Sequence, residues 1–128
     1  MVSIECPIIL DSIMSAKLST HVLDTKNGKP ASGVRIELLR ISESGEEHIL
    51  TATTNSDGRT DQPLLSGETI EAGDYKLIFH IGDYFYGSAA EAPFLSEVPV
   101  QFRINDPEGS YHVPLLASPW SYSVYRGS

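Results

Sequence analysis

Short segments in which apolar and polar residues alternate run through most of this chain, and turn-forming residues separate them at intervals of about 8 to 15 residues. The alternation is clearest in residues 75–81 and 98–104, where every second side chain is apolar. A period of two residues directs one face of a strand to a core and the other face away from it. Turn residues such as Asn27-Gly28 and Asp57-Gly58 lie between the segments. The pattern therefore predicts an all-β fold, and a length of 128 residues suits a single domain.

We expect about eight strands, packed as a two-sheet β-sandwich with Greek-key-like connections. One short helix is expected from Asp83 to Ala90, with Asp83 as its N-cap and Pro93 ending it. No internal repeat is present, which excludes solenoids and propellers. The expected strands cover residues 18–23, 34–38, 48–54, 63–65, 75–81, 98–104, 111–116 and 120–125.

Composition narrows the range of partners. The chain has 9 basic and 17 acidic residues, a formal net charge of −8. Nucleic acids and anionic bilayers both require a basic protein surface, so neither is an expected partner. No apolar run approaches the roughly 18 residues of a membrane span.

The N-terminal stretch, residues 1–17, is predicted to be an arm that precedes a single domain of residues 18–128. Cys6 is the only cysteine, so no disulfide can form within the chain, which fits a reducing compartment. The apolar residues 7–10 are flanked by Glu5 and Asp11, and no basic residue precedes them. A secretion signal is therefore not expected, and we expect the cytoplasm.

Common catalytic and metal motifs are missing from the sequence. The four histidines, His21, His48, His80 and His112, are too far apart for a local zinc motif. No serine-hydrolase elbow and no glycine-rich phosphate loop occurs. The sequence therefore indicates neither a metal nor a cofactor.

His21 and His112 differ from the other two histidines because the opposite face of each one's strand is strongly apolar. Both are therefore expected to point away from the core. Leu23, Pro114 and Leu116 share that outward face, which suggests a contact surface with another subunit. The alternative is that these are ordinary surface histidines beside scattered apolar residues.

Two stretches carry a resemblance to a known family. Leu-Ser-Thr-His-Val-Leu-Asp-Thr at residues 18–25, continuing through residues 28–34, resembles the opening signature of the transthyretin-related proteins. Tyr-His-Val-Pro-Leu-Leu at 111–116, with residues 118–122, resembles their closing signature. The likeness spans roughly residues 17–128. Within that family, a chain ending in Tyr-Arg-Gly-Ser, as residues 125–128 do here, is similar to the 5-hydroxyisourate hydrolases of urate degradation.

The resemblance implies a transthyretin-like sandwich and a homotetramer, built as a dimer of dimers, with substrate sites in a channel between the dimers. It implies hydrolysis of 5-hydroxyisourate to 2-oxo-4-hydroxy-4-carboxy-5-ureidoimidazoline without a cofactor. It also allows a peroxisomal as well as a cytoplasmic location. The implied catalytic residues are His21, Arg59, His112 and Ser128, and the implied substrate-binding residues are His21, Arg59, Tyr125, Arg126 and Gly127.

Each implied role suits the chemistry of its residue. His21 and His112 would jointly activate water and relay its proton, because histidine has an ordinary pKa of about 6.5. The planar guanidinium of Arg59 would hold the carbonyl and anionic oxygens. Tyr125 would orient or stack on the purine-like ring, and Ser128 would join the proton relay through its hydroxyl or the terminal carboxylate.

Two other readings of the sequence have to be weighed. The thyroid-hormone carriers of the same family have lysine, an acidic residue and threonine where this chain has His21, Arg59 and His112, and they lack the terminal tetrapeptide. The noncatalytic carboxypeptidase-regulatory-like sandwiches share turn patterns such as residues 28–36 and 54–58. In a passive sandwich, Arg59 would be a solvated loop residue and the tail would fray.

Overall fold

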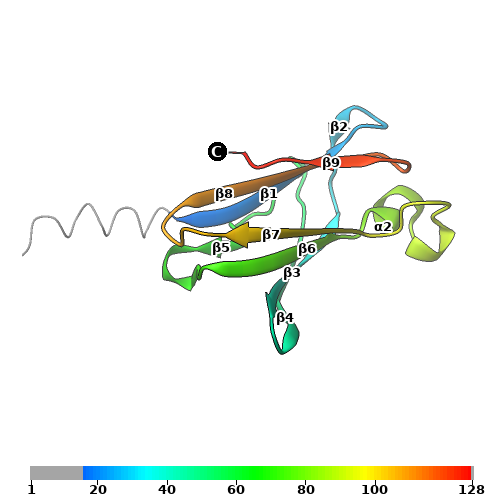
Figure 1. The fold of residues 1–128 in the computed structure, drawn as a ribbon. Coiled ribbons are helices and arrows are strands. Elements are labelled where there is room, and N and C mark those ends of the chain that lie inside the picture. The colour runs from blue at the N-terminus through cyan, green and yellow to red at the C-terminus, as the bar shows by residue number, and fades with distance from the viewer. Residues whose placement is uncertain (1–15, 128) are drawn as a thin grey trace, which may run out of the picture.

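A computed structural model describes residues 16–127 as two layers of β-sheet with short helical turns at their edges (Figure 1). The described strands number nine, one more than the expected eight, because Lys29–Pro30 also pairs as a short strand. The all-β sandwich with one short α-helix is confirmed. The strands are β1 (Lys17–Asp24), β2 (Lys29–Pro30), β3 (Arg35–Ser42), β4 (Gly45–Thr53), β5 (Leu65–Ser66), β6 (Gly73–Phe79), β7 (Val98–Ile104), β8 (Ser110–Ala117) and β9 (Tyr122–Val124). The helical segments are η1 (Gly67–Thr69), α2 (Ile81–Tyr86) and η2 (Ala89–Glu91).

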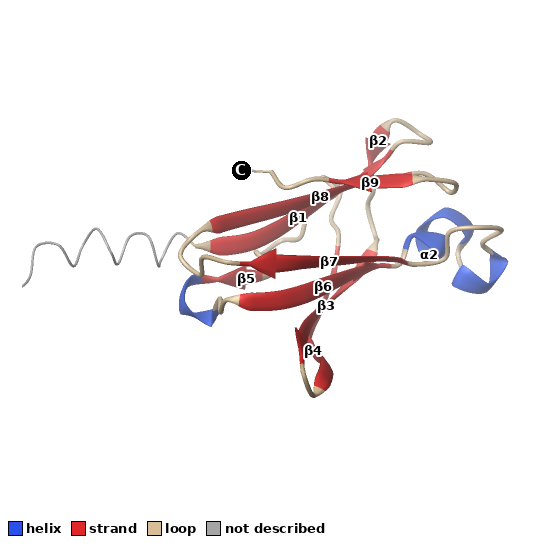
Figure 2. Cartoon of the chain, viewed as in Figure 1, coloured by secondary structure: helices blue, strands red, loops and turns tan. Residues whose placement is uncertain are grey.

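The strands form two separate sheets (Figure 2). One has the order β2-β1-β8-β9, with β5 also pairing to β1, and the other has the order β4-β3-β6-β7. The expected alternation is clearest in β1 and β6, where every second residue is buried. Fully buried side chains from both sheets, such as Leu18, Leu38, Leu77 and Leu115, form the core between them. Each such side chain contributes about 1.5–3 kcal/mol by leaving water.

Strands β1 and β8 are parallel, although most pairs in this fold are antiparallel. Their register sets Ser19 opposite His112 and His21 opposite Pro114. The parallel pair therefore joins the beginning and the end of the domain and brings both sequence signatures side by side.

The position of the helix corrects one prediction. α2 begins at Ile81, with His80 as its N-cap, and ends at Tyr86, with Gly87 as its C-cap, instead of running from Asp83 to Ala90. Gly87 has a φ of 80°, and its N–H donates to the carbonyl of Asp83 at 2.8 Å, which ends the helix early. Asp83 is no N-cap: its carboxylate instead accepts from the backbone N–H of Ala89 and holds the following turn η2.

The outward apolar surface also needs a correction. Pro114 is buried within the chain, whereas Leu23 and Leu116 are half-buried. Proline has no N–H to donate, and the β8–β9 ladder ends just before it, at the pair Leu115–Val124. Tyr125 and Arg126 therefore leave the ladder beside Pro114, and Gly127 pairs with His112 again as an isolated bridge.

The predicted N-terminal arm falls mostly outside the described residues. Of residues 1–17, the structure describes Ala16, which is buried, and Lys17, which begins β1. Within the described part of the chain, no helix is long and apolar enough to cross a membrane.

Candidate active site

The two outward histidines lie on the outer face of the β1–β8 pair. His21 and His112 are both half-buried, while their strand neighbours Thr20, Val22 and Val113 point into the core. His112 lies directly across from Ser19, two positions along β1 from His21. The predicted outward direction of both histidines is therefore what the structure shows.

His21 is oriented by a backbone carbonyl. Its Nε2 lies 3.0 Å from the carbonyl oxygen of Asp57. A carbonyl only accepts hydrogen bonds, so Nε2 must carry the proton, and in the neutral ring Nδ1 keeps its lone pair. A neutral His21 is thus held with one specific nitrogen available as a base.

His112 is oriented by a side chain. Its Nδ1 lies 2.8 Å from the hydroxyl oxygen of Ser19, and its Nε2 has no hydrogen-bond partner within the described part of the chain. Burial lowers the pKa of His112, and the nearby charges of Arg59, His21 and Lys17 lower it further. Both effects disfavour the imidazolium, so His112 stays neutral to a lower pH than an ordinary histidine.

Arg59 reaches this face on the loop between β4 and β5. Its backbone forms an isolated bridge with His21, and the carbonyl of the preceding Gly58 accepts from the N–H of Val22 at 2.8 Å. Gly58 has a φ of 77°, and a Cβ there would lie 2.5 Å from the Val22 oxygen, so only glycine fits this approach. The exposed guanidinium of Arg59 forms no ion pair with any residue from 16 to 127 and is available to a ligand.

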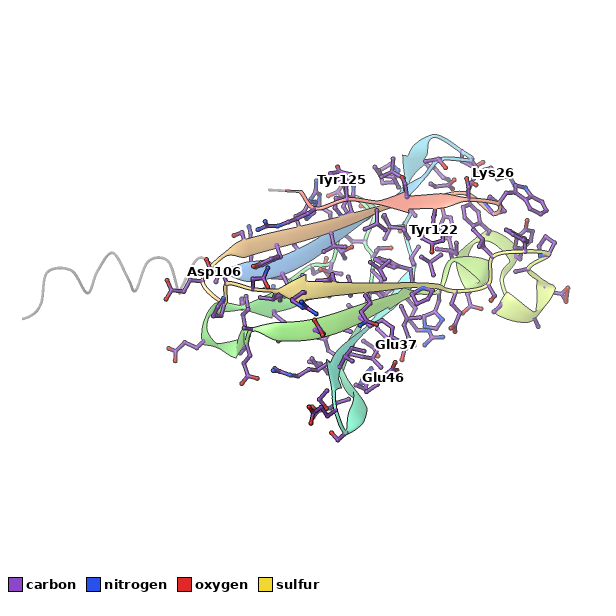
Figure 3. The ribbon with its side chains drawn as sticks, viewed as in Figure 1. Lys26, Glu37, Glu46, Asp106, Tyr122 and Tyr125 are labelled. Carbon is purple, nitrogen blue, oxygen red and sulfur yellow. The ribbon has the colours of Figure 1, made fainter. Side chains whose placement is uncertain are left out.

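The C-terminal tail covers part of the site. The N–H of Gly127 donates to the carbonyl of His112 at 2.7 Å. A Cβ on Gly127 would lie 2.8 Å from Cδ2 of the His112 ring, so the tail backbone packs directly on the imidazole. Tyr125, labelled in Figure 3, lies on the same tail. Its side chain is 56% exposed.

Arg126 is not gathered with the histidines. Its guanidinium lies over the ring of Tyr111, 4.4 Å from the centroid, and donates to the carbonyl of Ser110 at 3.1 Å. Tyr111 is buried and follows the inward alternation of β8, unlike His112. Ser128, the remaining predicted catalytic residue, lies outside the described residues.

Sequence reasoning missed three contributors to this face: Lys17, Ser19 and the carbonyl of Asp57. The alternation of β1 already placed Lys17 and Ser19 on the face of His21 and could have found them. The Asp57 carbonyl could not be found that way, because a backbone atom carries no residue signal. Between residues 16 and 127, no group of three or more His, Cys, Asp or Glu side chains could hold a metal ion.

Two parallel-paired terminal segments, two outward histidines and a loop arginine define a transthyretin-type sandwich with a polar site on one sheet face. The sequence model of the HIUase/Transthyretin family matches residues 18–127. The chain belongs to this family. A 5-hydroxyisourate hydrolase of Deinococcus radiodurans is 52% identical over 113 residues, which cover 87% of this chain and 95% of that protein.

Solved structures of both branches of the family share the fold. The 5-hydroxyisourate hydrolase of Klebsiella pneumoniae superposes with a TM-score of 0.73 at 32% identity, covering 88% of this chain and 94% of its own. Sea bream transthyretin in complex with thyroxine gives 0.77 at 28% identity, covering 88% and 95%. An (S)-allantoin synthase structure gives 0.80 at 42% identity and covers 90% of this chain, which spans 45% of that longer chain.

Proposed function

We propose that this protein hydrolyses 5-hydroxyisourate to 2-oxo-4-hydroxy-4-carboxy-5-ureidoimidazoline in urate degradation. The observation that carries the proposal is the convergence of His21, Arg59 and His112 on one sheet face, with Gly127 packed on the His112 ring. At the positions of His21, Arg59 and His112, the thyroid-hormone carriers have a lysine, an acidic residue and a threonine. The 52% identity to a protein named as this hydrolase, against 28% to a transthyretin, favours the enzyme over the carrier alternative.

The reaction breaks the bond between the ring carbonyl C6 and N1. The oxygen of water adds to C6 and the C6–N1 bond breaks. One proton of the water passes to N1, and the other is released to solvent as C6 becomes a carboxylate. Water needs a base as it attacks, and N1 needs an acid as it leaves. Neither Nδ1 of His21 nor Nε2 of His112 has a hydrogen-bond partner among residues 16–127, and we assign the proton relay to them jointly.

Arg59 stabilises the negative charge that develops on the oxygen at C6. Its unpaired guanidinium can present two parallel N–H groups to the carbonyl or to the oxygen that becomes negative at C6. Lys17 adds a second positive charge near His112. Although the chain carries a net charge of −8, repulsion from distant carboxylates is screened within about 8 Å at physiological salt, so these local cations dominate at the site.

The tail residues and the assembly belong to the same proposal. Tyr125 stacks on the substrate ring, Ser128 joins the proton relay and Gly127 completes the substrate site, whereas the guanidinium of Arg126 lies over Tyr111, away from the histidines. Leu23 and Leu116, half-buried beside the histidines, support a homotetramer in which this face is covered by a second dimer. We propose the cytoplasm as the location of the reaction. The hydrolases compared above come from bacteria, which have no peroxisomes.

A direct assay tests the activity. Purified protein is mixed with freshly generated 5-hydroxyisourate, and the ultraviolet absorbance of the substrate is followed against buffer and against His112→Asn. Faster decay with the parent than with either control is expected. Decay at the buffer rate, with binding of the substrate intact, would support the carrier alternative instead. Light scattering on the same sample tests the tetramer, and a stable, active monomer would refute it.

A further inference from the structure

The loop that presents Arg59 is organised around one side chain, Asn55. Oδ1 of Asn55 accepts hydrogen bonds from the backbone N–H of Asp57 at 2.8 Å and of Arg59 at 3.3 Å. Its Nδ2 donates to Oδ1 of Asp61 at 3.0 Å. A single amide thus joins three positions of the loop, using both its acceptor and its donor.

The backbone of Asn55 closes the same loop. Its N–H donates to the carbonyl of Arg59 at 2.7 Å, and its carbonyl accepts from the N–H of Gly58 at 2.9 Å. The preceding residue, Thr54, is buried, donates to the carbonyl of Ala31 and accepts from the N–H of Val34. Asn55 is therefore anchored to the sandwich on one side and holds the loop on the other.

This loop delivers two groups to the candidate site at once. The carbonyl of Asp57 binds Nε2 of His21 and so selects the nitrogen that carries its proton. The next residue but one, Arg59, supplies the free guanidinium. Asn55 binds the backbone N–H of both residues, so moving its amide would move both groups together.

We infer that Asn55 is a positioning residue that keeps His21 in its Nε2–H form and holds Arg59 in place. The kinetic consequences of this inference rest on the proposed hydrolysis. The effect of Asn55 on the His21 tautomer does not depend on the substrate. Asn55 does not touch the reacting atoms; it acts through the Asp57 carbonyl and the Arg59 backbone.

The chemistry of the amide makes two variants informative. Asn55→Ala removes all three side-chain hydrogen bonds. Asn55→Asp keeps an oxygen that accepts from Asp57 and Arg59, but it loses the donor to Asp61 and sets two carboxylates together. Ser56→Ala is the matched control, because Ser56 is exposed in the same loop and is not part of the candidate site.

The first measurement is steady-state hydrolysis across pH. Misplacing a catalytic group by about 1 Å costs on the order of 100-fold in rate, so we expect Asn55→Ala to lower kcat/KM by about 10- to 100-fold and to change the shape of the pH profile. Asn55→Asp should recover part of this loss, and Ser56→Ala should match the parent. An Asn55→Ala enzyme with parental kcat and an unchanged pH profile would overturn the inference.

The second measurement does not depend on activity. Protein labelled with ¹⁵N-histidine reports which ring nitrogen of His21 is protonated, and we expect the Nε2–H form in the parent and in Ser56→Ala, and a mixture of tautomers in Asn55→Ala. If the parent does not hydrolyse 5-hydroxyisourate but the tautomer shifts as expected, the proposed function fails and the positioning role stands. If Asn55→Ala does not fold, the ¹⁵N-histidine spectrum of Asn55→Asp decides. His21 in the Nε2–H form would support the inference, because this variant keeps an oxygen that accepts from Asp57 and Arg59. A mixture of tautomers would contradict the inference.

Discussion

Replacing Gly127 with alanine isolates the contact between the C-terminal tail and the His112 ring. The added Cβ would lie 2.8 Å from Cδ2 of His112, and carbon atoms in contact normally stay about 3.5 Å or more apart. The ring or the tail must therefore move by about 0.7 Å. Displacement of the ring stretches its 2.8 Å hydrogen bond to Ser19, and displacement of the tail stretches the 2.7 Å bond from Gly127.

A shift of this size at a proton-relay group predicts a fall in kcat/KM of about 10- to 100-fold. The same fall corresponds to about 1.4–2.7 kcal/mol of transition-state stabilisation. Stability should change by less than about 0.5 kcal/mol, because the tail contributes no buried side chain at this position. The assay is decay of 5-hydroxyisourate absorbance, with the midpoint of thermal unfolding measured on the same sample.

Gly109→Ala is the matched control, since a Cβ there meets nothing closer than 3.4 Å and its nearest neighbours are Asp106 and Tyr111, not a histidine. It should retain the parental kcat/KM. Parental activity in Gly127→Ala, or an equal loss in Gly109→Ala, would refute the idea that the tail is packed against a catalytic imidazole.

Four further outcomes are expected. His112→Asn should lower kcat by about 10²- to 10⁴-fold while circular dichroism stays unchanged, since the side chain lies outside the core; lost secondary structure would make His112 structural. Deleting residues 125–128 should leave a folded protein with little hydrolysis, and parental turnover would remove the tail from the mechanism. Lys17→Gln removes one of the charges that lower the pKa of His112, so the acid limb of kcat/KM should move to higher pH; an unmoved limb means that His112 does not set it. Glu37, labelled in Figure 3, has its pKa lowered first of all by a hydrogen bond from His80, so its stabilisation is present above the ordinary value of 4.5 and is lost as pH falls through the lowered pKa. Denaturant titrations should therefore show Glu37→Gln to be less stable than the parent at pH 7 and the difference to shrink in acid.

The sequence predicted the elements of this fold better than their partners. Period-two alternation identified β1 and β8 and directed His21 and His112 outward, because that pattern depends only on neighbouring residues. It could not predict that these strands are parallel partners, and so could not pair Ser19 with His112. Pairing is a property of two distant segments, which a local pattern does not encode.

Two expectations about single elements were wrong, for different physical reasons. The helix was expected to continue to Ala90, but Gly87 adopts the left-handed conformation that ends helices, and a glycine at that place is a local signal for a helix end. Pro114 was expected on an outward face in contact with another subunit, but it is buried within the chain, and alternation cannot show such burial. The Asp57 carbonyl that orients His21 could not be predicted from residue types, because every residue has a backbone carbonyl.

The parallel pairing of β1 with β8 also governs when this site can come into existence. Ser19 and His112 are 93 residues apart, and the eight residue pairs of this ladder form only after the chain has closed that distance. Contacts between distant segments are slow to form, since the entropy of loop closure is lost before the contacts contribute. During synthesis, the edge of β1 that pairs with β8 stays unpaired until almost the whole domain has left the ribosome. Until then, this edge can pair with other chains. Appearance of activity after dilution from denaturant should consequently be among the last events of refolding, later than the local hairpin of β3 and β4.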